Sequence, residues 1–165
     1  KEAYELLAGS LAAQPEQPEL LYESALLAEK LGRHEAMEAS LRKLIRLKPE
    51  HAHAYNALGY SFAERNQRLE EAEQLVVKAL QLSPDDPFII DSMGWVLYRK
   101  GDNQGALAHL QRAFSIRPDP EIAAHLGEVL WALGRRDEAK RIWQEAAKAH
   151  PGNEVLAEVI KRFAP

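Results

Sequence analysis

Proline recurs along this chain at an almost constant interval, and this periodicity limits the fold more than any other feature. Pro15, Pro49, Pro84, Pro118 and Pro151 are separated by 34, 35, 34 and 33 residues. Each proline follows one helical pattern and precedes another, because its ring and its missing N–H group end a helix. A period of this length indicates a repeated structural unit. We therefore expect an array of similar helical units rather than a closed bundle.

A second break divides each unit into two helices. It is polar and often contains glycine, as in "KLGRHE", "RKGDNQ" and "ALGRRDE". Gly32, Gly101 and Gly134 are well placed there as carboxyl-terminal caps of the first helices. The turn at 65–69 has no glycine, and one extra residue in it accounts for the 35-residue interval. Each unit is therefore predicted to be a pair of antiparallel helices.

A further set of glycines, Gly59, Gly94 and Gly127, lies inside the first helices of the units. Glycine inside a helix costs about 1 kcal/mol relative to alanine, so a compensating contact is expected. Small residues occupy the facing positions of the second helices, namely Ala72, Ala79, Ala106, Ala113, Ala139 and Ala146. The simplest explanation is a close approach of the two helices, which makes these glycines packing residues without a chemical role.

The residues of these units resemble the tetratricopeptide repeat family. The stretch "YNALGYSF", followed by Ala72, Val76, Ala79 and Pro84, is similar to the signature W-x2-L-G-x2-Y, A-x3-F, A, P. Two later units match with Met93, Gly94, Leu97, Ala106, Leu110, Ala113 and Pro118, and with Leu126, Gly127, Leu130, Ala139, Trp143, Ala146 and Pro151. The unit before them departs from the signature at Ala25, Met37 and Leu44. The resemblance implies an all-α fold, a right-handed superhelical solenoid of antiparallel helix pairs.

The resemblance covers essentially the whole chain, 1–165, as a single array with ten helices. Its four repeats are expected at 18–49, 52–84, 86–118 and 120–151. Residues 1–16 fit the second helix of a truncated repeat, which suggests a fragment of a longer protein. The segment "NEVLAEVIKRFAP" has apolar residues at helical spacing, so residues 153–163 are predicted to form a capping helix.

A narrower resemblance rests on "DSMGWVLYRKG" and "PDPEIAAHLGEVLWALGRRDEA". These phrases are similar to the carboxyl-terminal repeats of proteobacterial tetratricopeptide proteins, many of them outer-membrane lipoproteins that face the periplasm. Some of those proteins are adaptors that deliver substrates to a periplasmic carboxyl-terminal processing protease. The resemblance implies a periplasmic location with a membrane anchor outside this chain, and a cytoplasmic location is the alternative.

First helices line the inner surface of such arrays, and ligands bind there. Asp91, Trp95 and Tyr98 have the i, i+4, i+7 spacing of a helix stripe separate from the packing glycine. With the comparable positions of the other units they predict a partly exposed groove for a protein or peptide, formed by Tyr22, Asn56, Tyr60, Asp91, Trp95, Tyr98, His125, Glu128 and Trp131. The alternative is that these side chains cover one another as ordinary packing between repeats. No lysine occupies these positions, so the family's basic carboxylate clamp is not expected.

Composition excludes several classes of protein. The net charge of −4 argues against nucleic-acid binding, and the absence of cysteine excludes disulfides and thiol chemistry. No apolar run approaches the roughly 18 residues of a membrane span. The six histidines form no H-E-x-x-H motif, and neither a G-x-S-x-G elbow nor a phosphate loop is present. We therefore expect no enzyme activity, no metal and no cofactor.

Two classes of function remain. The first is an adaptor that binds a partner segment in the groove. The second is a structural or oligomerising array whose ends stack on other copies. Ala3, Tyr4, Leu7 and Leu11 belong to a helix that has lost its partner at the amino end, so we interpret self-association through this end as a consequence of truncation.

Overall fold

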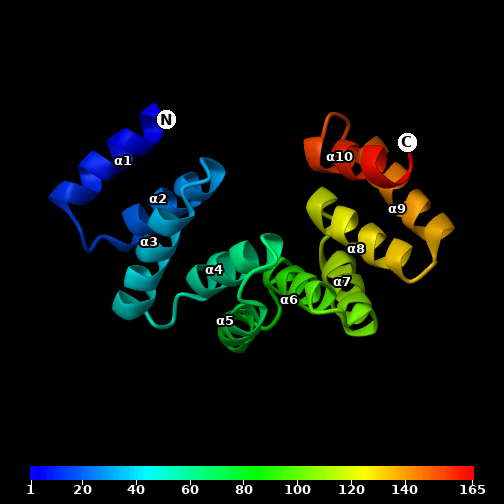
Figure 1. The fold of residues 1–165 in the computed structure, drawn as a ribbon, viewed down its shortest axis with the longest axis horizontal. Coiled ribbons are helices and arrows are strands. Elements are labelled where there is room, and N and C mark those ends of the chain that lie inside the picture. The colour runs from blue at the N-terminus through cyan, green and yellow to red at the C-terminus, as the bar shows by residue number, and fades with distance from the viewer. The chain divides into compact units, whose positions relative to one another are not determined.

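The structure, a computed structural model, describes residues 1–165 and contains ten helices and no strand (Figure 1). This confirms the predicted all-α fold of antiparallel helix pairs. The helices are α1 (Glu2–Ala13), α2 (Pro18–Lys30), α3 (His34–Leu47), α4 (Ala52–Glu64), α5 (Leu69–Leu82), α6 (Pro87–Arg99), α7 (Asn103–Ile116), α8 (Pro120–Ala132), α9 (Arg136–Ala149) and α10 (Glu154–Phe163).

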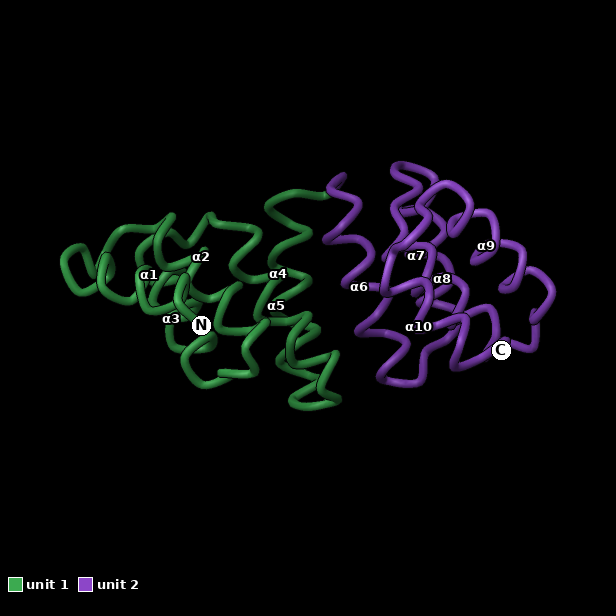
Figure 2. Tube along the Cα trace, turned by 90° about the horizontal axis from the view of Figure 1, so that it is seen from above, with its two compact units in different colours: residues 1–84 green, residues 85–165 purple.

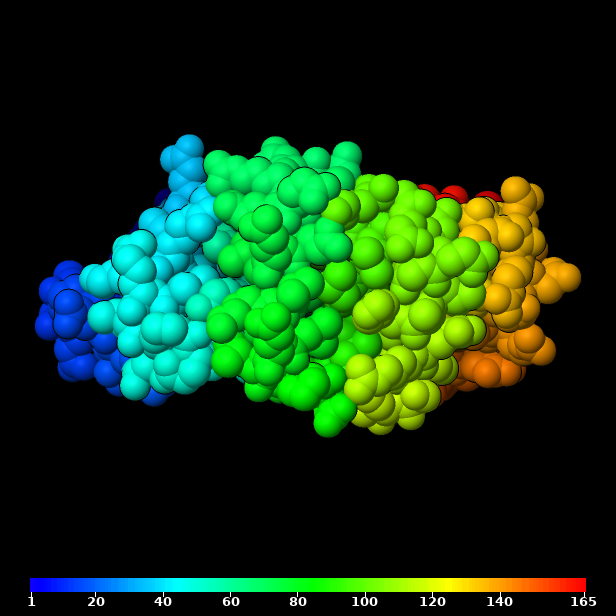
Figure 3. Space-filling view, turned by 90° about the horizontal axis from the view of Figure 1, so that it is seen from below, coloured from blue at the N-terminus to red at the C-terminus, as the bar shows by residue number.

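The helices form two compact units, residues 1–84 (unit 1) and residues 85–165 (unit 2) (Figure 2). In unit 1, α2 pairs with α3 and α4 pairs with α5, while α1 packs on α2. In unit 2, α6 pairs with α7 and α8 pairs with α9, and α10 packs on both α8 and α9. On the face that Figure 3 shows, the surfaces of successive helices within each unit meet without an open gap. A single right-handed array running through both units remains a prediction.

Helix α1 has the least protected side chains of unit 1. None of its residues is buried, and Leu6 is 71% exposed. Its one aromatic ring, on Tyr4, lies 4.5 Å from the guanidinium of Arg33. Self-association through this end of the chain remains a prediction.

Three of the four first helices begin with proline, and in α6 and α8 an aspartate stands directly before it. Pro18, Pro87 and Pro120 are the first residues of α2, α6 and α8, a position where the missing N–H group of proline has no helical partner to lose. The carboxylate of Asp86 accepts a hydrogen bond from the backbone N–H of Phe88 at 2.9 Å. Asp119 caps α8 in the same way, so the local sequence fixes both starting points.

The first helices end in left-handed turns. Gly101 has a φ of 92°, and the N–H of Asp102 after it donates to the carbonyl of Leu97 at 2.9 Å. The predicted caps Gly32 and Gly134 also have positive φ. In the glycine-free turn, Asn66 takes the left-handed conformation with a φ of 53°, which asparagine tolerates better than most side chains.

The helix pairs approach closely at the internal glycines, as predicted. A Cβ atom added to Gly59 would lie 2.9 Å from the carbonyl oxygen of Ala72. At Gly94 it would lie 2.7 Å from Cγ of Leu110. At Gly127 it would collide with the indole of Trp143, which is fully buried. The missing side chains therefore make room for the second helices, and Ala72 and Trp143 pack where a Cβ atom would stand.

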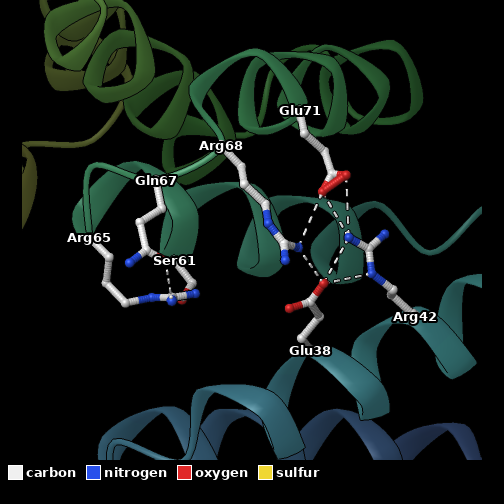
Figure 4. A network of polar contacts seen from close by, with 7 residues as sticks. All are labelled: Glu38, Arg42, Ser61, Arg65, Gln67, Arg68 and Glu71. Carbon is white, nitrogen blue, oxygen red and sulfur yellow. Dashed lines mark hydrogen bonds and ion pairs between the residues drawn. The ribbon is translucent and has the colours of Figure 1, made fainter.

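In unit 1, four charged side chains connect the second helices of successive pairs (Figure 4). The guanidinium of Arg42 on α3 donates to Glu38 at 2.9 Å and to Glu71 on α5 at 2.8 Å. Arg68 donates to Glu38 at 2.8 Å. Burial alone would raise the pKa of Glu38, but the hydrogen bonds from both arginines lower it. Because all four groups are partly solvated, each pair contributes only about 0.2–1 kcal/mol and chiefly orients α3 on α5.

Replacing the packing glycine of α6 should separate the helices of its pair. In Gly94→Leu the new side chain would overlap Leu110, and overpacking of this kind costs about 1–3 kcal/mol or more. We expect a lower free energy of unfolding in urea denaturation followed by circular dichroism. The matched control is Gly9→Leu in α1, where an added Cβ atom meets nothing within 4 Å. Equal stability of the two variants would contradict the close approach.

Candidate functional site

The nine predicted groove residues fall into two sets. Tyr22, Asn56 and Tyr60 lie in unit 1, on α2 and α4. The other six lie in unit 2, where α6 and α8 pack beside each other and carry three residues each. Those of α6 are Asp91, Trp95 and Tyr98, and those of α8 are His125, Glu128 and Trp131.

Asp91 and His125 form a buried pair that joins α6 to α8. Their exposed fractions are 6% and 8%. Nδ1 of His125 lies 2.9 Å from Oδ1 of Asp91, and because the carboxylate accepts, this nitrogen carries the proton. The buried Ser92 hydroxyl donates to the carbonyl of Phe88 in its own helix at 3.0 Å rather than to this pair. The pair is therefore a structural tie between the two helices.

Trp95 belongs to the same buried layer. Its indole stacks on the imidazole of His125, with ring centroids 4.2 Å apart, and the guanidinium of Arg99 lies 5.2 Å from its centre. Only 3% of Trp95 is exposed. The prediction that Trp95 is partly exposed is therefore wrong, because a side chain from the neighbouring first helix covers it. The alternative, packing between repeats, describes Asp91, Trp95 and His125.

Tyr98, Glu128 and Trp131 remain partly exposed in unit 2, and we call them the aromatic site. Burial raises the pKa of Tyr98, and the nearby carboxylate of Glu128 raises it further. Arg162 on α10 donates to Glu128 at 2.9 Å. The site thus presents a tyrosine hydroxyl and a carboxylate oriented by an arginine.

The indole of Trp131 is supported from behind by other aromatic rings. It stacks on Trp143 of α9 with centroids 5.9 Å apart and contacts Phe163 of α10 at 5.8 Å. The Arg136 guanidinium lies 5.0 Å from its centre. Sequence reasoning missed Arg136 and Arg162, because nothing in helical spacing indicates which side chains of α9 and α10 reach α8.

All three residues of the unit 1 set are partly exposed. The Oδ1 atom of Asn56 is nevertheless buried and has no hydrogen-bond partner. An unsatisfied buried acceptor commonly costs about 1–3 kcal/mol. The ring of Tyr22 lies 5.2 Å from that of His51, a neighbour that the sequence did not indicate.

No group of three or more His, Asp or Glu side chains lies together in a way that could hold a metal ion. None of the ten helices has both the length and the apolarity that crossing a bilayer requires. Aromatic surfaces, single carboxylates and an amide are the groups presented.

Comparison with known proteins agrees with the repeat pattern. Residues 24–87 and 97–161 each match a family model described as Tetratricopeptide repeat. The TPR repeat-containing protein PA4667 of Pseudomonas aeruginosa is 46% identical over 128 residues, which cover 78% of this chain and 22% of that protein. This chain thus spans less than a quarter of the length of that relative.

Solved structures of tetratricopeptide repeat proteins share the fold. The protein TTC0263 of Thermus thermophilus superposes with a TM-score of 0.85 at 26% identity, covering 98% of this chain and 87% of that one. YrrB, described as a TPR protein with an unusual peptide-binding site, has a TM-score of 0.67 at 22% identity, over 96% of this chain and 84% of that one.

Truncating Trp95 should destabilise unit 2, because the indole is buried between α6 and α8. Replacing a buried tryptophan by alanine typically costs about 3–5 kcal/mol, so Trp95→Ala should lower the denaturation midpoint strongly. Tyr98→Ala, on the same helix but partly exposed, should cost clearly less. Urea titrations of both variants compare them directly. A Trp95→Ala protein as stable as Tyr98→Ala would show that the indole is not part of the core.

Proposed function

Because the chain belongs to the tetratricopeptide repeat family, we propose that it is a non-catalytic scaffold that binds a segment of a partner protein. The fold is consistent with a protein–protein interaction scaffold in general terms. YrrB, which shares the fold, is described as having a peptide-binding site, and this supports a peptide as the ligand.

The proposed contact surface of unit 2 is the aromatic site, Tyr98, Glu128 and Trp131. The observation that carries the proposal is that these side chains keep exposed surface while their surroundings are fixed. The rings of Trp143 and Phe163, which stack on each other, pack against Trp131, and Arg162 donates to Glu128. Tyrosine and tryptophan are common anchors in interfaces, because each buries a large area and keeps one polar group. A fixed anchor also loses little conformational entropy when a ligand binds.

The partner is proposed to be an extended or helical segment with apolar side chains and at least one hydrogen-bond donor. Apolar side chains would cover the rings of Tyr98 and Trp131, and the donor would reach Glu128. In unit 1, the partly exposed Asn56 is proposed to contact the backbone of a bound segment. Tyr22 and Tyr60 complete the proposed contacts there.

A finer proposal concerns the biological role. The phrases around Trp95 and Trp131 resemble adaptors of a periplasmic carboxyl-terminal processing protease, and the match to a Pseudomonas aeruginosa repeat protein is compatible with such a source. We infer that this chain forms part of an adaptor that brings substrates to that protease. Adding the chain to the purified protease should then accelerate cleavage of a protein substrate. Unchanged cleavage, together with no co-purification of the protease, would contradict this role.

Loss of an anchor should weaken binding more than folding. A peptide selected from a random library against the wild-type chain serves as the probe. Tyr98→Ala should raise its Kd about 30-fold, the equivalent of roughly 2 kcal/mol for a truncated anchor. Isothermal titration calorimetry gives the Kd, and circular dichroism checks the fold.

The matched control is Phe88→Ala. Phe88 is also an aromatic residue of α6 and is 37% exposed, but it lies at the opposite end of the helix, beside Arg117. This variant should bind the probe as the wild type does. If Phe88→Ala weakens binding and Tyr98→Ala does not, the contact surface lies elsewhere on unit 2.

A further inference from the structure

Unit 1 contains a pocket apart from the aromatic site. It lies where the start of α2 faces the connection between α3 and α4, and its volume is about 360 Å³. This is within the range of roughly 300–1,000 Å³ that is common for ligand pockets. The lining side chains with polar or aromatic groups are Glu19, Tyr22, Glu23, Lys48, Glu50 and His51.

The charges of this pocket are predominantly negative. Three carboxylates stand against one ammonium group, and none of the four forms an ion pair within 4 Å. Glu19 and Glu23 also lie four residues apart on α2, an arrangement in which like charges repel each other. By contrast, the carboxylates of Glu38 and Glu71 in the same unit are both engaged by arginine. The pocket thus leaves negative charge uncompensated.

Two aromatic rings form a wall of the pocket. The rings of Tyr22 and His51 lie 5.2 Å apart at an angle of 46°. His51 is fixed in place because its Nδ1 atom accepts the backbone N–H of Ala54 at 3.1 Å and so caps α4. Since Nδ1 accepts, the ring proton of the neutral imidazole is on Nε2. The start of α4 therefore holds the His51 side of the wall in place.

We propose that this pocket binds an arginine side chain presented by a segment of a partner protein. A guanidinium is planar, always charged and rich in donors, so it can lie on an aromatic face and donate to carboxylates at the same time. Lysine is a point charge and uses the aromatic wall less well. The protein already shows the stacking half of this arrangement, since the guanidinium of Arg33 lies 4.5 Å from the centre of the Tyr4 ring.

Short capped peptides test this proposal directly. The probes are acetyl-Gly-Arg-Gly-amide and the same peptide with lysine or with uncharged citrulline at the central position. In NMR titrations of the full chain, the arginine peptide should shift the amide signals of Tyr22, Glu23 and His51 saturably. The lysine peptide should bind more weakly, and the citrulline peptide should not bind. Equal binding of the citrulline or the lysine peptide would overturn the proposal.

Two isosteric substitutions test whether the carboxylates of the pocket bind the arginine peptide. Glu19→Gln combined with Glu23→Gln should weaken binding of the arginine peptide at least tenfold. The control combines Glu154→Gln with Glu158→Gln, which removes two exposed carboxylates with the same four-residue spacing from the start of α10. The control should bind like the wild type. Equal losses of affinity in the two variants would mean that net charge attracts the peptide non-specifically, and this would overturn the proposed pocket site.

The pocket shares Tyr22 with the contacts proposed for unit 1, but it has no residue in common with the aromatic site. Tyr98→Ala should leave the titration with the arginine peptide unchanged, because the two sites share no residue. Failure at one site is therefore distinguishable from failure at the other. Binding of spermidine as tight as that of the arginine peptide would assign the pocket to a free polyamine instead and would also overturn the proposal.

Discussion

The close approach of paired helices at glycine is the constraint on which the rest of this protein depends. Where Gly94 and Gly127 lack a side chain, Leu110 and Trp143 of the following helices take the space. Because the glycine side of each first helix packs against the second helix of its own pair, only the opposite face can make further contacts. The stripe that contains Trp95 and the stripe that contains Trp131 therefore occupy faces that the pair interface cannot reach.

In unit 2, one part of these faces packs against a neighbouring helix and another part remains exposed. The stacked Trp95 and His125, with Asp91 bonded to the imidazole, set the position of α8 against α6. Tyr98 and Trp131 follow further along the same helices and keep part of their surface exposed. The buried layer thus fixes the spacing of the exposed one, which is why a binding role and a packing role coexist within one stripe.

The sequence predicted what depends on local chemistry and on period. Proline spacing indicated the helix pairs, and the internal glycines indicated the pair interfaces. The exposure of Trp95 was predicted wrongly, because helical spacing assigns a residue to a face but does not say which neighbour covers that face. Asn66 as a left-handed cap was missed, since only glycine was expected in that conformation. The contacts of Arg162 and the pocket beside Tyr22 also escaped, because the repeat period places helices next to each other but does not say which of their side chains meet.

The placement of the tryptophans has a spectroscopic consequence. Trp95, Trp131 and Trp143 all lie in unit 2, whereas unit 1 carries only tyrosine and phenylalanine as aromatic chromophores. Indole emission excited at the red edge of the absorption band therefore reports on residues 85–165 alone, while the far-ultraviolet signal averages over both units. Unfolding of residues 85–165 can therefore be followed without any dye and compared with unfolding of the whole chain.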